Sequence, residues 1–375
     1  MKIAVNTRFL LKGKLEGIGW VTYELLQRMV KAHPEDEFFF LFDRPYDPKF
    51  VFAENVRPLV LFPPARHPLL WWLWFERAVP KALKNCEADV FLSTDSYLSL
   101  GTSVKTAMIC HDIAHVHFPE EIPFLVNQYY QHFVPRFLKR AEQVISVSHF
   151  TKADIIRQYA IDAEKIAVVH NACREGFIPL DETSQSAVRQ RYAQGKPYFF
   201  YVGAVHPRKN VHRLITAFDQ YKSASSASTQ LLIGGRFAWQ TGPVKTAYDQ
   251  SSFREDIHFL GYLSEEALKQ VLASALAFVY PSLFEGFGLP VLEAMHCGVP
   301  VITSKVSSLP EISGDAGILV DPTSIAQIAN AMQQLEGDEK LRQKLVEKGN
   351  RQKEKFDWEQ SAEQAYQLLR GLGQS

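Results

Sequence analysis

Short apolar runs alternate with longer amphipathic segments along this chain, and the alternation occurs in two series. In the first series, buried strands are predicted at KIAVNT, EFFFLFD, ADVFLST and KTAMICHD, with helices at GWVTYELLQRMVKA and FERAVPKALKN. QVISVSHF, TKADIIRQYA and IAVVHNA continue it as strand, helix and strand. Such alternation is typical of βαβ units, whose strands pair in parallel. It predicts an α/β protein.

A polar stretch with Pro and Gly, IPLDETSQSAVRQRYAQGKP, interrupts the pattern after residue 178 and predicts a linker with a short helix. A second series of apolar runs and helical segments then follows. We predict an N-terminal domain over 1–178 and a C-terminal domain over 190–357. The last segment, 358–375, predicts one more amphipathic helix. Ligands of such domains gather at the carboxyl ends of the strands.

Composition narrows the class of protein. Of 375 residues, 46% are hydrophobic and 22% charged, and the formal net charge is zero, which argues against a nucleic-acid partner. No run of 18 apolar residues predicts a membrane-spanning helix, and MKIAVNTRFL lacks the apolar core of a signal peptide. The four cysteines are scattered, as expected of reduced thiols. We therefore expect a cytoplasmic protein.

The stretch FEGFGLPVLEAMHCGVPVITS, residues 284–304, carries the strongest functional signal. It predicts a loop with Glu285, then a helix with Pro290 in its first turn and Glu293 about one turn further in. The loop backbone at Gly286, Phe287 and Gly288 is open to a ligand, and amides at a helix start favour an anion. Carboxylates on either side accept hydrogen bonds from hydroxyls. A nucleotide sugar has this layout, with hydroxyls at both ends and a diphosphate between them. A favourable interaction with the helix dipole would account for either glutamate alone, but not for the whole stretch.

Two adjacent cations stand in the first strand-to-helix loop of the second series. In YVGAVHPRKNVHRLI, a strand ends near Val202, a helix starts near Val211, and Arg208 and Lys209 lie between them. An arginine fork and a lysine point charge suit a diphosphate and would neutralise charge on a leaving diphosphate. Without the acidic stretch, a solvated basic turn explains the pair equally well.

Three weaker signals lie in the first series. Gly17 and Gly19 in LEGIGWVTYEL precede a predicted helix and would let the backbone approach a diphosphate, although a plain loop explains them as well. His111 follows the strand in MICHDIAHVHFPEE and is positioned to contact a sugar, or to serve the fold alone. His115 and His117 raise a zinc alternative, which the lack of a helical i,i+4 spacing and of a cysteine pair disfavours.

An aromatic segment, LLWWLWFERAV, offers a further alternative. Trp71, Trp72 and Trp74 beside basic residues are compatible with docking on a membrane surface. Packing of a helix against the sheet explains them more simply, and we favour that interpretation.

Taken together, these motifs resemble the retaining glycosyltransferases of family 4, which have the GT-B fold of two Rossmann-like domains facing across a cleft. The resemblance covers nearly the whole chain. Residues 284–304 resemble that family's E-x7-E signature, GAVHPRKN its donor-phosphate loop, and FDWEQSAEQAYQLL the closing helix that returns to the N-terminal domain. Two departures are Glu16, where many relatives have a first glycine, and Asn171-Ala172, where relatives often have Asn-Gly.

The resemblance implies a role for each matching position. Glu285 would contact hydroxyls of the donor sugar and Glu293 the nucleotide ribose, while His111 would contact the transferred sugar. Arg208 and Lys209 would bind the diphosphate, and Gly288 and Leu289, which follow Gly286 and Phe287, would offer backbone amides near it. Gly17 and Gly19 would lie nearby from the other domain.

The resemblance also implies a reaction. A hexose, with GDP-mannose as our expected donor, would move with retention to a glycan or lipid-linked acceptor in cell-surface polysaccharide assembly. No metal or other cofactor is expected, and a lipid-linked acceptor would require peripheral membrane contact. A sugar-nucleotide epimerase and a non-catalytic nucleotide-sugar binder stay as alternatives. A nicotinamide oxidoreductase is disfavoured, because no strand leads into G-x-G-x-x-G.

Overall fold

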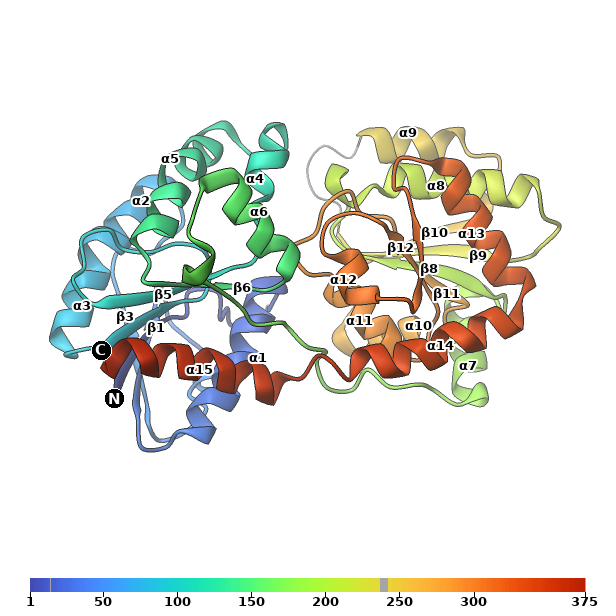
Figure 1. The fold of residues 1–375 in the computed structure, drawn as a ribbon. Helices are drawn as coiled ribbons and strands as arrows, with labels where there is room; N and C mark the ends of the chain where they lie inside the picture. Colours follow the sequence, from blue (N-terminus) through green and yellow to red (C-terminus); the bar gives the residue numbers. More distant parts are fainter. Residues whose placement is uncertain (14, 237–241, 375) are drawn as a thin grey trace. The chain divides into compact units, whose positions relative to one another are not determined.

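The computed structural model describes residues 1–13, 15–236 and 242–374. The chain divides into two compact units, Met1–Ala172 with Asp357–Ser375, and Cys173–Phe356 (Figure 1). The second unit therefore starts before the polar stretch at 178–197, which carries helix α7 (Glu182–Ala193). The helix α15 (Trp358–Gln374) closes the chain within the first unit.

The first unit is built on a seven-stranded sheet whose strands all pair in parallel, in the order β3-β2-β1-β4-β5-β6-β7. The strands are β1 (Lys2–Asn6), β2 (Glu37–Phe42), β3 (Val56–Val60), β4 (Val90–Ser93), β5 (Lys105–Cys110), β6 (Gln143–Ser146) and β7 (Ile166–Val168). The helices are α1 (Gly17–Ala32), α2 (Pro68–Leu73), α3 (Val79–Asn85), α4 (Ala114–His117), α5 (Phe124–Arg140), α6 (His149–Tyr159) and α15.

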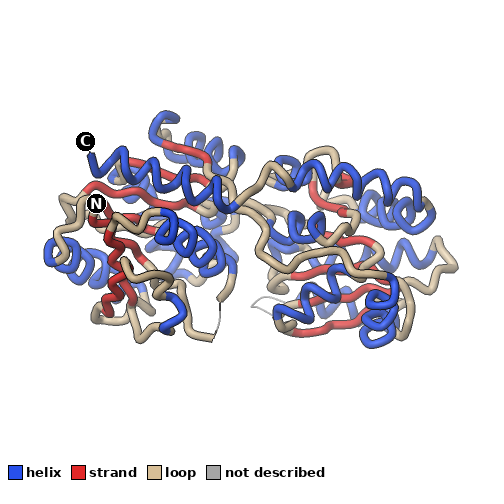
Figure 2. Tube along the Cα trace, turned by 90° about the horizontal axis from the view of Figure 1, so that it is seen from below, coloured by secondary structure: helices blue, strands red, loops and turns tan. Residues whose placement is uncertain are grey.

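The second unit has a six-stranded parallel sheet in the order β10-β9-β8-β11-β12-β13. Its strands are β8 (Tyr198–Val202), β9 (Gln230–Gly234), β10 (Ile257–Gly261), β11 (Ala277–Tyr280), β12 (Val301–Ser304) and β13 (Gly317–Val320). Its helices are α7, α8 (Val211–Ser223), α9 (Gly242–Gln250), α10 (Glu265–Ala273), α11 (Leu289–His296), α12 (Leu309–Ser313), α13 (Ile325–Gly337) and α14 (Glu339–Lys353). Figure 2 shows helices on both faces of each sheet.

Both strand orders reverse direction in the middle of the sheet, which is the arrangement of a Rossmann-like fold. The first three strands of each unit run outward to one edge, and the chain then returns to pair β4 with β1 and β11 with β8. In such folds the loops that follow the two central strands turn toward opposite faces of the sheet, and ligands bind between these loops. The predicted α/β class and its two Rossmann-like domains are confirmed.

The edge strand β3 was not predicted, because Arg57 and Pro58 interrupt its apolar run. Proline has no amide hydrogen to donate to a sheet, so it is confined to edge strands or strand starts. The first helix also begins earlier than predicted. Gly17 and Gly19 lie inside the first turn of α1 rather than before it, and Glu16 is the residue at its N-cap.

The last helix, α15, covers the sheet of the first unit beside α1 (Figure 1). Its buried face includes Leu369 and Tyr366. The Tyr366 hydroxyl donates to Asp36 Oδ2 at 2.6 Å, and the Asp36 Oδ1 atom accepts from the Met1 amino group at 2.6 Å. This return of the chain matches the closing helix that the sequence predicts.

The two glycines of α1 differ in how much room they have. A Cβ atom at Gly19 would lie 2.7 Å from the Phe9 carbonyl oxygen, whereas one at Gly17 would meet nothing within 4 Å. We predict that Gly19→Ala lowers the free energy of unfolding by about 1–3 kcal/mol because backbone must shift. Gly17→Ala, the matched control, should be neutral or stabilise the helix by up to about 1 kcal/mol. Calorimetric melting of both variants measures this; equal melting temperatures would contradict it.

Candidate functional site

The candidate site of the second unit forms where the loops after β8 and β11 meet at the centre of the sheet. The 3-10 turn Pro207–Lys209 follows β8 and carries both predicted cations. Asn210, in left-handed conformation, ends this turn and precedes α8. Its buried side-chain amide donates to the carbonyl oxygens of Pro281 at 2.9 Å and Pro322 at 2.6 Å. Asn210 therefore ties the cationic loop to the acidic one, a role that the sequence analysis missed.

The half-buried Lys209 and the buried Glu285 form an ion pair. The Lys209 Nζ atom lies 2.6 Å from Glu285 Oε1 and 3.0 Å from the Tyr280 hydroxyl. Burial by itself would raise the pKa of Glu285, but the charges of Lys209 and Arg208 outweigh burial and hold that pKa below its ordinary value. The carboxylate is thus ionised at neutral pH and accepts hydrogen bonds only.

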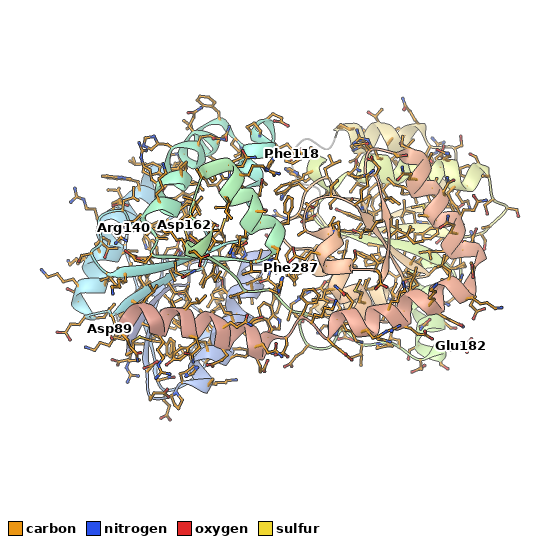
Figure 3. The ribbon with its side chains drawn as sticks, in the orientation of Figure 1. Asp89, Phe118, Arg140, Asp162, Glu182 and Phe287 are labelled. Atoms are coloured by element: carbon orange, nitrogen blue, oxygen red, sulfur yellow. The ribbon has the colours of Figure 1, made fainter. Side chains whose placement is uncertain are left out.

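Two serines, Ser307 and Ser308, form hydrogen bonds with the backbone of the loop before α11. Ser308 Oγ donates to the carbonyl oxygens of Glu285 at 3.0 Å and Phe287 at 2.6 Å, and Ser307 Oγ accepts from the Glu285 amide at 3.1 Å. The Phe287 side chain, labelled in Figure 3, is buried and packs edge-on against Phe356. Its carbonyl and ring therefore serve the fold.

Gly288 lies at the N-cap of α11 with φ +114°, a conformation that favours glycine. A Cβ there would also lie 2.8 Å from the Leu309 side chain. Leu289 is the first helical residue and Pro290 follows it in the first turn, as predicted. Amides at such a helix start have no intrahelical acceptor and bind anions readily.

Glu293 is buried on α11, and its partner is Arg174, a residue that the sequence analysis did not select. The Arg174 Nε and Nη2 atoms lie 3.0 Å and 2.7 Å from Glu293 Oε1. Arg174 stands 119 positions earlier, just after the boundary at Cys173. Nothing in the local sequence signals such a pairing, because Arg174 belongs to an irregular segment without periodicity.

In the first unit, the loops after β1, β4 and β5 surround a cavity of about 540 Å³. A buried ion pair between Arg8 and Asp95 forms part of its wall, and the Arg8 guanidinium stacks over the Tyr97 ring with 4.1 Å to the centroid. Further lining comes from Arg44 and Arg66. The cavity therefore combines aromatic faces with charged groups, the chemistry that sugar and phosphate ligands require.

His111 also lines this cavity, while Gly17 and Gly19 do not. Its Nε2 atom lies 2.8 Å from the Thr94 carbonyl oxygen, which can only accept a hydrogen bond. Nε2 must therefore carry the proton, which leaves Nδ1 as an acceptor. Burial lowers the pKa of His111, despite opposing effects of Thr94, Asp112 and Asp95. His111 is thus a neutral imidazole at neutral pH.

The histidines behind the zinc alternative have protein partners instead. His115 Nε2 lies 2.8 Å from the Tyr159 hydroxyl, and His117 Nε2 lies 2.7 Å from the buried Asp154 Oδ2. Each ring thus has its own partner rather than converging with the other on one point.

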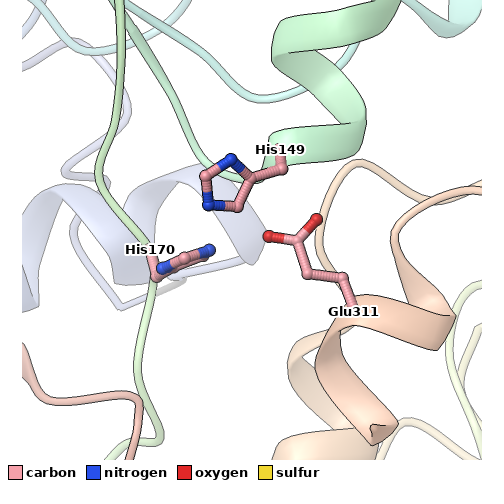
Figure 4. Close-up of side chains that lie close together, drawn as sticks. All are labelled: His149, His170 and Glu311. Carbon is pink, nitrogen blue, oxygen red and sulfur yellow. The ribbon is translucent and has the colours of Figure 1, made fainter.

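A second histidine pair of the first unit was not selected from the sequence. The rings of His149, at the start of α6, and His170, after β7, lie 5.5 Å apart between centroids (Figure 4). The third side chain drawn there, Glu311, belongs to α12 of the second unit.

Family models match both units. "Glycosyltransferase Family 4" matches residues 15–174, and "Glycosyl transferases group 1" matches residues 184–352. The O-antigen chain mannosyltransferase B of Escherichia coli is 31% identical over 96% of this chain and 98% of its own. The chain belongs to this glycosyltransferase family. The O-antigen chain mannosyltransferase RfbU of Salmonella typhimurium is 29% identical over 72% of this chain and 71% of its own.

A solved structure supports the fold of this glycosyltransferase. Sucrose-phosphate synthase from Thermosynechococcus elongatus superposes with a TM-score of 0.79 and 20% identity, over 99% of this chain and 98% of the other. The GT-B class and the family that the sequence motifs indicate are both confirmed.

The Arg174–Glu293 pair generates a stability prediction. We expect Arg174→Gln to lower the free energy of unfolding by about 3 kcal/mol, because it leaves the Glu293 carboxylate buried without a compensating charge. The double variant with Glu293→Gln should recover most of this loss. Denaturant unfolding of both single variants and the double variant gives the coupling; additive losses would show that the pair is not energetically linked.

The Lys209–Glu285 pair generates a pH prediction. The folded-state pKa of Glu285 lies below its ordinary 4.5, so the stabilisation is present above that pH and is lost as pH falls through the folded value. Glu285→Gln should therefore flatten the decline of unfolding free energy below a pH of about 4.5. Exposed Glu255→Gln is the control and should leave the decline as in the parent. An unchanged decline in Glu285→Gln would contradict the assignment.

Proposed function

We propose that this enzyme transfers mannose from GDP-mannose, with retention of configuration, to a glycan or lipid-linked acceptor in cell-surface polysaccharide assembly. The observation that carries the proposal is the Lys209–Glu285 ion pair at the start of α11, with Arg208 beside it. Two relatives named as O-antigen chain mannosyltransferases support the choice of sugar and pathway class. Guanine as the base is our expectation from that likeness.

The charge balance of the second unit's site suits a nucleotide diphosphate sugar. Glu285 pairs with Lys209 and Glu293 with Arg174, while Arg208 and the α11 amides add positive potential of the kind that phosphates require. We assign the diphosphate to Arg208, Lys209 and the Gly288–Leu289 amides. Glu285 then accepts hydrogen bonds from sugar hydroxyls, and Glu293 from the ribose.

The reaction then proceeds by departure of the diphosphate. Positive groups that already point at the phosphates stabilise the charge that develops as the glycosidic carbon–oxygen bond breaks. The acceptor hydroxyl attacks from the face that the phosphate leaves, and its proton passes to a phosphate oxygen, so that configuration is retained. This route requires neither a metal nor a protein nucleophile. Neutral His111 would accept a hydrogen bond from the transferred sugar through Nδ1.

An epimerase and a nucleotide-sugar binder without turnover remain the competing hypotheses. The first measurement is therefore nucleotide release from UDP-, GDP- and ADP-sugars, with and without EDTA, first alone and then with mannose-containing oligosaccharides. Acceptor-dependent release of GDP from GDP-mannose despite EDTA would support the proposal. Epimerised sugar without an acceptor would replace it with the epimerase, and nucleotide binding with no turnover on any acceptor would favour the binder.

Single substitutions separate the assigned roles. We predict that Arg208→Ala or Lys209→Ala lowers kcat by about a hundredfold, because charge on the leaving diphosphate is stabilised mainly in the transition state. Glu293→Ala should mainly raise the donor KM, since a ribose contact is equal in the ground and transition states. Lys344→Ala, an exposed lysine on α14, is the matched control. Steady-state kinetics tests this, and parental turnover in either cation variant would refute the phosphate assignment.

A further inference from the structure

The tryptophans of the first unit, for which the sequence favours packing, lie within the fold. The Trp71 ring meets Tyr129 of α5 edge-on, with 5.3 Å between centroids, and the Trp71 Nε1 atom donates to the Ala65 carbonyl oxygen at 2.9 Å. Trp74 is fully buried. The packing role of Trp71 and Trp74 is therefore confirmed, and no helix among the described residues is long and apolar enough to cross a bilayer.

Two tyrosines of the second unit's sheet lie next to the candidate site, and no step of the proposed reaction uses them. Tyr201 lies on β8, and Tyr280 is the last residue of β11, which pairs directly with β8. Their rings stack with 5.9 Å between centroids and an interplanar angle of 21°. Both side chains are buried. A buried phenol hydroxyl usually has a hydrogen-bond partner, so the partner of each hydroxyl indicates its role.

The two hydroxyls have different partners. The Tyr201 hydroxyl donates to the backbone carbonyl oxygen of Ala204 at 3.5 Å, whereas the Tyr280 hydroxyl lies 3.0 Å from the Lys209 Nζ atom. A lysine ammonium can only donate, so the Tyr280 oxygen is the acceptor. The Nζ atom is 5.4 Å from the centroid of the Tyr280 ring, which makes the hydroxyl, rather than the ring face, the closer contact.

Tyr280 keeps its own proton in this environment. Burial raises the pKa of Tyr280 well above its ordinary value, and the nearby Glu285 carboxylate raises it further. The side chain is therefore a neutral phenol at neutral pH. It binds the ammonium through one directed hydrogen bond and not through an opposite charge.

A directed contact matters for Lys209 because its other printed contact is an ion pair. Lysine is a point charge on a flexible four-carbon chain, so an ion pair with Glu285 alone allows several positions of the ammonium around the carboxylate. A hydrogen bond from a second, rigid element restricts those positions. The cost in side-chain entropy is then met before a ligand arrives.

Tyr280 is itself fixed by the centre of the sheet. Its ring stacks on Phe278 of the same strand, with 5.6 Å between centroids and an interplanar angle of 20°. Its carbonyl oxygen accepts a hydrogen bond from the Thr303 hydroxyl of β12 at 2.9 Å. Tyr280 therefore connects the Lys209 ammonium to the most rigid part of the second unit.

The pairing of Lys209 also indicates which phosphate it serves. Its partner Glu285 is the carboxylate assigned to the sugar hydroxyls, so Lys209 lies at the sugar end of the donor. We propose that Tyr280 is a positioning residue of the transfer reaction, whose hydroxyl holds the Lys209 ammonium against the phosphate that is bonded to the sugar. This role rests on the proposed function, which assigns the diphosphate contact to Lys209.

The variant Tyr280→Phe tests the role, because it keeps the ring and removes only the hydroxyl. The product GDP retains the phosphate that leaves the sugar, whereas GMP lacks it. We expect the Kd for GDP to rise about tenfold and the Kd for GMP to stay parental. The kcat with GDP-mannose should also fall about tenfold, since charge on that phosphate develops in the transition state.

The matched control is Tyr198→Phe. Tyr198 is the first residue of β8, at the opposite end of the strand from the site, and its buried hydroxyl donates to the Val271 carbonyl oxygen at 2.7 Å. This control loses one buried tyrosine hydroxyl of the same sheet, so its affinities and kcat should be parental. Calorimetric titration measures the affinities, with the UDP–UMP and ADP–AMP pairs alongside, and thermal melting checks that both variants fold.

A double variant shows whether Tyr280 acts through Lys209. In a Lys209→Ala background, Tyr280→Phe should change neither the Kd for GDP nor kcat any further, because the group that the hydroxyl positions is absent. Additive losses would overturn the proposal. So would parental affinity and turnover in Tyr280→Phe, or an equal loss of affinity for GDP and GMP, which a general disturbance of the sheet would produce.

Failure of the proposed function gives a different result. If the parent turns over no nucleotide sugar, the difference between the diphosphate and the monophosphate affinities still reports the position of Lys209. Loss of that difference in Tyr280→Phe and in Lys209→Ala, without further loss in the double variant, would then refute the transfer reaction and support the positioning of Lys209 by Tyr280.

Discussion

Parallel pairing of every strand is the constraint on which the functional geometry of both units depends. It places all carboxyl ends of a sheet at one edge, and the reversal of strand order leaves a crevice beside β1 and β4, and another beside β8 and β11. The cations after β8 and the glutamate after β11 therefore meet, although 76 positions separate Lys209 from Glu285. The cavity of the first unit forms by the same rule, after β1, β4 and β5.

The two buried glutamates of the second unit's candidate site are each paired with a cation. Each carboxylate of the E-x7-E signature has its own cation, Lys209 for Glu285 and Arg174 for Glu293. Such pairs hold long side chains in one position before a ligand arrives, so less conformational entropy is lost on binding. A polyanionic ligand would meet cations that carboxylates already orient, rather than mobile surface side chains.

Periodicity and short motifs were sufficient to predict the fold class, most strands and helices, and the loops that carry the candidate site. They failed where structure depends on distant partners. Arg174 pairs with Glu293 from an irregular segment, and buried Asn210 bridges to Pro281 and Pro322; neither bond has a local signal. The start of α1 at Gly17 was missed because two glycines indicate a loop on propensity alone.

The path of the chain has a consequence for biosynthesis. The second unit is inserted between two parts of the first, because α15 follows it in sequence yet belongs to the first unit. During synthesis, Cys173–Phe356 leaves the ribosome before α15 does. At that stage the sheet of the first unit still lacks α15, whose Leu369 and Tyr366 side chains are buried in the folded protein. The inserted unit can complete its own core first, and the core of the first unit is completed only after α15 has emerged.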